Sequence, residues 1–192
     1  MTITPLTKEE AIKLKSKDLS EFNKFLSNHF YASKDDLTKV LKAHLYVEYL
    51  IDQILTSSFP NPSKLLRTKF SYKIDLLEAI GSEFYMKIIE PLRTLNNIRN
   101  KYSHNLNYQP TKYDIYELCK IVELKKERTL NAGLFSIISY LHALKTVTIS
   151  LPYLTACLRG KILFEKDKGF DIKKINESYK DEAKVFLESL KI

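Results

Sequence analysis

The chain has 192 residues, of which 44% are hydrophobic, and it carries a formal net charge of +8 at pH 7. This length is near that of one domain with a substantial core, so no second enzyme domain need be present in it. The excess of Lys and Arg favours an anionic partner, and nucleic acid is the commonest soluble one.

Only four glycines and six prolines interrupt long segments with the 3.6-residue period of helices, and no alternating β-branched run suggests a sheet. The sequence therefore predicts an all-α fold, an up-and-down bundle of about six to seven helices. Thr7 and Glu10 form a capping-box pattern that opens a first helix, expected to end at about His29. A second helix is expected over about 33–58, and the proline-containing segment 59–62 ends it.

A third helix is expected to end at Gly81, since glycine suits the C-terminal stop of a helix. The fourth helix contains Pro91, which either kinks it or starts its second half. The next break is expected at 107–110.

Thr111 can cap a fifth helix that reaches about Arg128. A long sixth helix is expected from Leu134, with a bend at Pro152, and a seventh over 175–191. The sixth lies in the longest apolar stretch of the chain, which charged residues and a proline interrupt. That composition favours a buried bundle helix over a membrane span.

The most informative segment is Arg99-Asn100-Lys101-Tyr102-Ser103-His104, near the end of the fourth helix. Arginine stays protonated and its planar fork of donors matches phosphate oxygens. A histidine imidazole can take or give a proton near neutral pH. Metal-free cleavage of RNA requires both kinds of group.

The geometry of a helix separates Arg99 from His104. Leu92, Leu95 and Ile98 are spaced to face a core, but five residues turn a helix by about 140°, so Arg99 and His104 do not share one stripe. They can meet in a cleft between two helices or between two subunits.

This segment resembles the motif of the HEPN superfamily, in which an Arg, a polar residue, a short spacer and a His mark small all-α domains. Here the polar residue is Asn100 and four residues separate Arg99 from His104. The resemblance also includes the preceding helices, which contain 43–51 and 70–81. It implies one domain over 1–192, with the motif region at 37–108 and the helices of 111–192 completing a bundle that dimerises through the motif helix.

The resemblance implies a metal-independent endoribonuclease, a toxin or antiviral (abortive-infection) effector, with Arg99, Asn100 and His104 as catalytic residues. Lys101 and Tyr108 are candidate substrate-binding residues. Many toxin members place a tyrosine two residues after the histidine, where this chain has Leu106. The alternative is a non-catalytic, dimeric HEPN-like scaffold that binds a protein or nucleic acid partner.

A second constellation is His44 and Glu48, one helical turn apart and in line with Leu37, Leu41, Ile51 and Leu55. Two interpretations stay open. Either residue could orient Arg99 or His104 as a supporting neighbour, or the two could form a self-satisfied hydrogen-bonded core pair. A third possibility is a metal site of His44, Glu48 and His104, which nothing in the spacing singles out.

Other features bear on partners and location. Cys119 and Cys157 lie far apart, which indicates neither a zinc site nor a disulfide framework and suits a reducing cytoplasm. The N-terminal residues become charged at once and lack the apolar core of a signal peptide. We therefore expect a cytoplasmic homodimer that binds RNA, with a possible antitoxin or defence-system partner, and without a membrane, metal or cofactor.

Overall fold

The computed structural model describes residues 8–59, 61–121 and 128–166, and within these ranges the chain is helical with no β-strand. The all-α prediction is thus confirmed for the described residues. By its contacts the chain divides into two units, residues 12–148 and residues 1–11 together with 149–192. Of the second unit only helical backbone at 8–11 and 149–166 is described, so the account below concerns the first.

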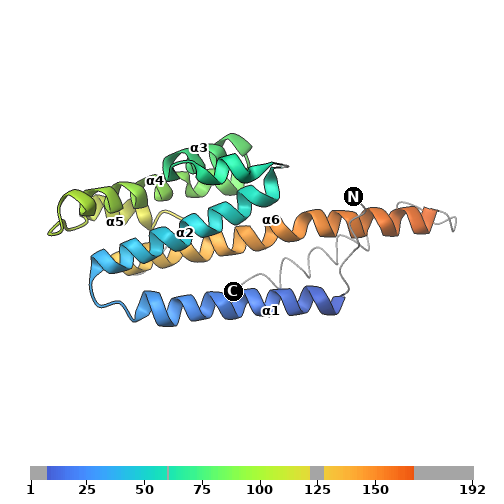
Figure 1. The fold of residues 1–192 in the computed structure, drawn as a ribbon, viewed down its shortest axis with the longest axis horizontal. Coiled ribbons are helices and arrows are strands. Elements are labelled where there is room, and N and C mark those ends of the chain that lie inside the picture. Colours follow the sequence, from blue (N-terminus) through green and yellow to red (C-terminus); the bar gives the residue numbers. More distant parts are fainter. Residues whose placement is uncertain (1–7, 60, 122–127, 167–192) are drawn as a thin grey trace. The chain divides into compact units, whose positions relative to one another are not determined.

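The helical elements follow one another along the chain as Figure 1 labels them. In chain order they are α1 (Lys8–Phe25), a π-helical turn η1 (Leu26–Tyr31), α2 (Asp36–Ser58), a 3-10 turn η2 (Pro62–Arg67), α3 (Phe70–Ile80), α4 (Glu83–His104), α5 (Lys112–Leu118) and α6 (Leu130–Lys166).

Three predicted helix ends are confirmed. α2 ends at Ser58, directly before the proline-containing segment. Gly81 ends α3 in the left-handed conformation, with φ of 70°, which glycine adopts without steric cost. Thr111 caps α5, and Asp114 completes a capping box with it.

Other boundaries differ from the prediction. Asp35 caps α2 by accepting from the N–H of Thr38 at 2.7 Å, so the helix begins later than expected. α5 ends at Leu118, about ten residues short of the expected end, and α6 begins four residues before Leu134. α4 runs through Pro91 as one helix. The expected cap at Thr7 and the expected helix at 175–191 lie outside the described residues.

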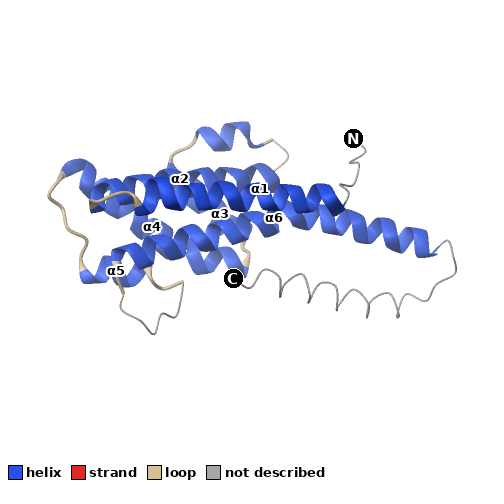
Figure 2. Ribbon diagram, turned by 90° about the horizontal axis from the view of Figure 1, so that it is seen from below, coloured by secondary structure: helices blue, strands red, loops and turns tan. Residues whose placement is uncertain are grey.

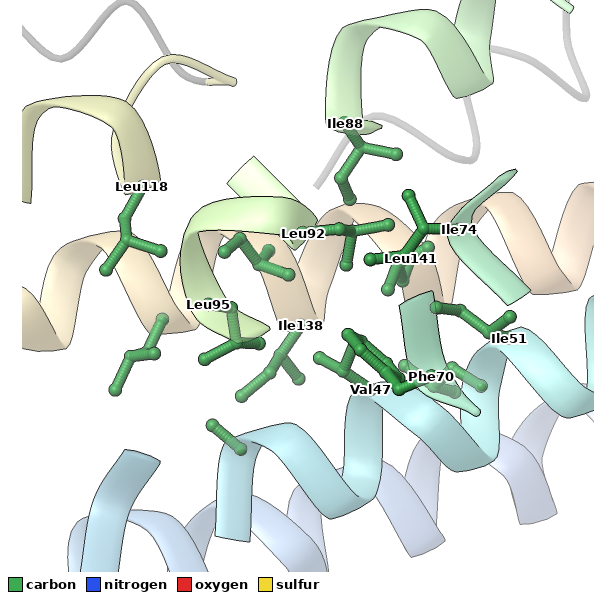
Figure 3. Close-up of a cluster of buried hydrophobic side chains, with 14 of the residues drawn as sticks. Val47, Ile51, Phe70, Ile74, Ile88, Leu92, Leu95, Leu118, Ile138 and Leu141 are labelled. Carbon is green, nitrogen blue, oxygen red and sulfur yellow. The ribbon is translucent and has the colours of Figure 1, made fainter. Parts of the chain in front are cut away.

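The core is formed by side chains of α1, η1, α2, α3, α4, α5 and α6, and Figure 3 shows the part to which α2 to α6 contribute. α4 alone contributes Ile88, Leu92, Leu95 and Ile98, all fully buried, which confirms the predicted core-facing positions of that helix. Burying an aliphatic side chain of this size stabilises a fold by roughly 1.5–3 kcal/mol. The helix that ends in the Arg-Asn-His motif is therefore held firmly in the core.

α6 supplies Leu134, Ile137, Ile138 and Leu141 to this core. Its segment Leu130–Ile149 is long and apolar enough to cross a membrane by length and composition, and 44% of the tested stretch is buried within the structure. A core helix of a soluble protein has the same properties, so length and composition alone do not identify a membrane span.

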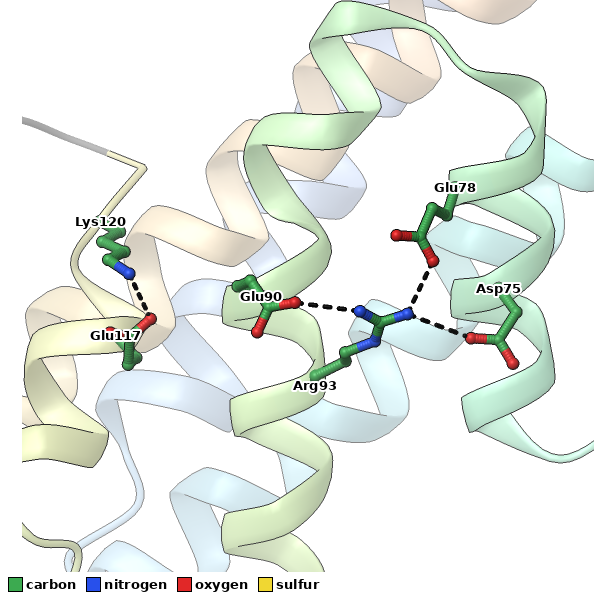
Figure 4. Close-up of polar contacts among 6 residues, drawn as sticks. All are labelled: Asp75, Glu78, Glu90, Arg93, Glu117 and Lys120. Carbon is green, nitrogen blue, oxygen red and sulfur yellow. Dashed lines mark hydrogen bonds and ion pairs between the residues drawn. The ribbon is translucent and has the colours of Figure 1, made fainter.

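Polar contacts also join the helices. Figure 4 shows Arg93 of α4 between Glu90 on its own helix and two carboxylates of α3, with Nη2 2.7 Å from Glu78 and 3.4 Å from Asp75. α1 lies along α2 and the first half of α6 (Figures 1 and 2). Asp18 of α1 forms an ion pair with Lys145 there, and α1 also stacks Phe25 on Tyr46 of α2 at 3.8 Å between ring centroids.

Candidate functional site

The Arg-Asn-His motif forms the last turns of α4, and the chain leaves the helix directly after it. Asn105 adopts an extended conformation, with φ of −149° and ψ of 102°, and its N–H donates to the carbonyl of Lys101 at 2.9 Å. Ser103 donates its hydroxyl to the carbonyl of Asn100 at 2.6 Å. The end of the helix and the following loop therefore have a defined geometry next to His104.

An open pocket of about 480 Å³ lies at this end of α4. Four of its lining residues are spaced i, i+3, i+4 and i+7 along the helix, which places them on one face. They are Asn97, Asn100, Lys101 and His104, and the loop adds Asn105 and Tyr108. The pocket thus combines an imidazole, an ammonium group and three amides, a set rich in donors for phosphate or carbonyl oxygens.

Arg99 does not line this pocket, as the helical rotation between Arg99 and His104 predicts. Its Nη1 donates to Oδ1 of Asn100 at 3.0 Å. A guanidinium has only donors, so this contact fixes the orientation of the Asn100 amide. The NH2 group of Asn100 has no acceptor among the described residues and is available to a ligand in the pocket.

His104 is exposed, and its imidazole has no hydrogen bond or ion pair with any residue that the structure describes. The histidine is therefore accessible and unconstrained by a protein partner. Such a group can accept a proton from a bound hydroxyl.

Lys101 is held by a polar network at the pocket wall. Its Nζ lies 3.2 Å from the hydroxyl of Tyr108 and 3.4 Å from Oδ1 of Asp114, and the Tyr108 hydroxyl donates to Oδ2 of Asp114 at 2.5 Å. The hydrogen bond with Tyr108 and the nearby Asp114 raise the pKa of Lys101. This lysine is therefore a cation that the network holds in position at the pocket.

Asp114 is the member of this network that sequence reasoning missed. Burial would raise its pKa, but hydrogen bonds from Tyr108 and Thr111 outweigh burial and hold the pKa below its ordinary value. The spacing Thr111-x-x-Asp114 is a capping pattern readable from sequence. Its second role, binding Tyr108 and Lys101, depends on how the loop folds back and leaves no such signal.

His44 lies on the other side of α4, toward Arg99. It is buried, and its ring centroid is 4.2 Å from that of Phe70. Burial lowers the pKa of His44, Glu48 opposes this effect, and Arg99 lowers the pKa further. His44 is therefore a neighbour of Arg99, although no hydrogen bond joins His44 to Arg99 or His104 among the described residues.

Of the two interpretations of His44 and Glu48, the self-satisfied hydrogen-bonded pair is not formed. Glu48 accepts from Nζ of Lys73 on α3 at 2.8 Å, and Asp52 forms an ion pair with the same nitrogen at 2.8 Å. The Nε2 atom of His44 is buried without a partner in the described structure. The expected placement of Leu41 on the buried stripe is also wrong, since 40% of its surface is exposed.

No group of three His, Cys, Asp or Glu side chains that could hold a metal ion occurs within the described ranges. The metal site considered above is therefore not formed by His44, Glu48 and His104. Cys119 is a free, buried thiol.

Comparison with known proteins places this chain in no group: no family of proteins, curated protein or solved structure matches it.

Proposed function

We propose that this chain is a metal-independent endoribonuclease of the HEPN type, acting in the cytoplasm as a toxin or antiviral effector. The observation that carries the proposal is the pocket in which one face of α4 presents His104 together with Asn100 and the positioned cation Lys101. The net charge of +8 suits a substrate with a phosphate backbone.

In the proposed reaction, His104 takes the proton from a ribose 2′-hydroxyl, and that oxygen attacks the adjacent phosphorus. The bond from phosphorus to the 5′ oxygen breaks, which leaves a 2′,3′-cyclic phosphate and a 5′-hydroxyl. The Asn100 NH2 and Lys101 Nζ hold the nonbridging oxygens as charge builds on them. DNA resists cleavage because it lacks the 2′-hydroxyl.

The proposed active form is a homodimer whose interface includes α4 from about Pro91 to His104. Arg99 projects away from the pocket of its own chain, so a second copy would supply Arg99 to stabilise charge and His104 to protonate the 5′ oxygen. The exposed side chains of Leu41, Leu45 and Tyr49, one turn apart on α2, would provide apolar surface for such an interface. Light scattering at micromolar concentration should report a dimer, and a stable monomer would contradict this arrangement.

The alternative is a non-catalytic scaffold in which Arg99 and His104 serve packing. Both side chains are exposed in the described chain, so in this alternative they would pack only against a second copy. The deciding experiment incubates the purified protein with total RNA in EDTA and analyses the new ends. Cleavage with 2′,3′-cyclic phosphate ends supports the proposal, and an absolute requirement for a divalent ion or equal cleavage of 2′-O-methyl RNA would reject the mechanism.

A further inference from the structure

Within the described segment 112–121, the acidic side chains of α5 are turned inward. Asp114 and Glu117 are the two acids of this segment, and both are buried. Asp114 accepts from the hydroxyl of Tyr108, and Oε2 of Glu117 lies 2.8 Å from Nζ of Lys120 (Figure 4). The outer face of α5, opposite Asp114, therefore exposes no carboxylate in this segment.

The same outer face exposes cations and an aromatic ring. Lys112, Tyr116 and Lys120 are exposed and spaced four apart, which places them on one side of the helix, and we call them the α5 stripe. Nζ of Lys120 lies 5.7 Å from the centroid of the Tyr116 ring. The guanidinium carbon of Arg128, an exposed residue just before α6, lies 4.5 Å from the same centroid. One ring thus stands among several exposed cations.

Cations beside an aromatic ring match the chemistry of a nucleic acid strand. The cations can bind phosphate oxygens, and a lysine that is paired with one carboxylate keeps further N–H donors. The ring of Tyr116, which has 43% of its surface exposed, offers a face on which a base can stack. An acidic protein segment would match only the cations, whereas a nucleotide strand matches the ring as well.

The α5 stripe is close to the pocket at the end of α4. Tyr108 lines that pocket and binds Asp114, which precedes Tyr116 by two residues. The two sides of a helix are about 10–12 Å apart, side chains included. A strand bound in the pocket therefore needs only a few further nucleotides, at ~3.4 Å for each stacked one, to reach the stripe.

We propose that the α5 stripe, together with Arg128, binds single-stranded RNA outside the pocket, with one base stacked on Tyr116 and neighbouring phosphates on the cations. That the strand is RNA rests on the proposed nuclease function, whereas the stacking and the phosphate contacts rest on the stripe. Binding there is independent of base identity, because every base has a π-face. The stripe anchors the strand, and the chemistry belongs to the pocket.

Fluorescence anisotropy with a 2′-O-methyl RNA dodecamer measures binding without cleavage, because the attacking hydroxyl is blocked. Tyr116→Leu removes the stacking face and should weaken binding at least about fivefold. Tyr116→Phe keeps the face and should bind as tightly as the wild-type protein. Tyr72→Leu, at an exposed tyrosine of α3, is the matched control and should leave the affinity unchanged.

The salt dependence of binding tests the cations. Each phosphate contact with a single strand contributes about 0.7 to the slope of log K against log salt concentration. Lys112→Gln and Arg128→Gln should each reduce this slope by about that amount. Lys87→Gln removes the same charge at an exposed position of α4 outside the pocket lining, and it should keep the wild-type slope.

Inorganic polyphosphate carries the charge of a nucleic acid without its bases. Tyr116→Leu should leave the affinity for polyphosphate unchanged, since only the cations bind it. An equal loss of affinity for polyphosphate and for RNA would show that the ring only supports the cations, and it would overturn the stacking.

A folded Tyr116→Leu protein that binds RNA as tightly as the wild type would overturn the proposal. If this variant does not fold, unchanged salt slopes in Lys112→Gln and Arg128→Gln would overturn it instead. RNA binding that depends on the stripe, without RNA cleavage in EDTA, would support the stripe and reject the nuclease. Cleavage by a protein whose affinity for RNA does not depend on the stripe would reject only the stripe.

Discussion

The hydroxyl of Tyr108 donates to Oδ2 of Asp114 at 2.5 Å, and Thr111 donates to the same carboxylate oxygen through both its N–H and its hydroxyl. One carboxylate thus caps α5 and holds the wall of the pocket. Lys101 completes the arrangement from α4. The loop between the two helices therefore depends on a side chain that lies beyond the motif.

Removing the Tyr108 hydroxyl tests this dependence. Tyr108→Phe should lower the free energy of unfolding by about 1 kcal/mol, because it removes a hydrogen bond to a charged, partly buried acceptor. RNA cleavage should fall as well, since Lys101 loses one of its two partners. Chemical denaturation and a cleavage assay measure the two effects. Tyr113→Phe, at a tyrosine with 70% of its surface exposed, is the control and should change neither.

His104→Ala should yield a folded protein with little activity. The proton transfer assigned to this imidazole is worth about 10²–10⁴-fold in rate, whereas the exposed side chain contributes little packing. Expression of the parent should slow bacterial growth, and the variant should relieve this effect at unchanged soluble yield. Arg99→Ala should do the same. His29→Ala, at another exposed histidine near a helix end, should remain as toxic as the parent.

If the two motif variants stay toxic, or melt far below the parent, the assignment of chemistry to this segment fails. Variants that melt far below the parent would support the scaffold interpretation, in which these side chains serve packing.

Lys73 should be important for stability. Its side chain is 3% exposed and lies between Glu48 and Asp52 of α2. Lys73→Met should lower the free energy of unfolding by about 2 kcal/mol, because it leaves two partly buried carboxylates without their counter-charge. Lys69→Met, at an exposed position four residues earlier on the chain, should change it by less than about 0.5 kcal/mol. Equal effects of the two variants in urea denaturation would show that the ion pairs of Lys73 do not stabilise the fold.

Stability should depend on pH through His44. Burial holds the pKa of His44 below its ordinary value of 6.5. As pH falls below about 6.5, the unfolded chain binds a proton that the native state does not, so the free energy of unfolding decreases toward the lowered native pKa. His44→Leu should reduce this slope in denaturation curves between pH 7 and 5. The slope should not vanish, because burial also lowers the pKa of His142.

The helix ends and the buried face of α4 were predictable from sequence, because the interactions that determine them involve residues only a few positions apart. Gly81 and Thr111 mark helix ends through backbone conformation and capping, and the period of Leu92, Leu95 and Ile98 identifies the buried face of α4. These properties require no knowledge of distant parts of the chain.

Contacts between distant residues were not predictable in the same way. The partner of Glu48 is Lys73, 25 residues away on another helix, and nothing in the period of α2 indicates it. Leu41 fits the apolar period but is exposed, because no described helix covers that side of α2 at this position. In the site, spacing alone indicates that Asn100 and His104 share a face, while the contribution of Asp114 depends on a folded loop.

Because Asp114 both caps α5 and binds Tyr108 and Lys101, the pocket depends on α5 staying folded. α5 has seven residues, and a helix of this length is marginal unless contacts with its surroundings support it. Each opening of α5 releases the carboxylate that holds Tyr108 and Lys101, so the pocket exists only in the closed fraction of molecules. Its apparent affinity for a ligand is weakened in proportion to that fraction. Slower amide hydrogen exchange in α5 upon ligand binding would be the physical signature of this coupling.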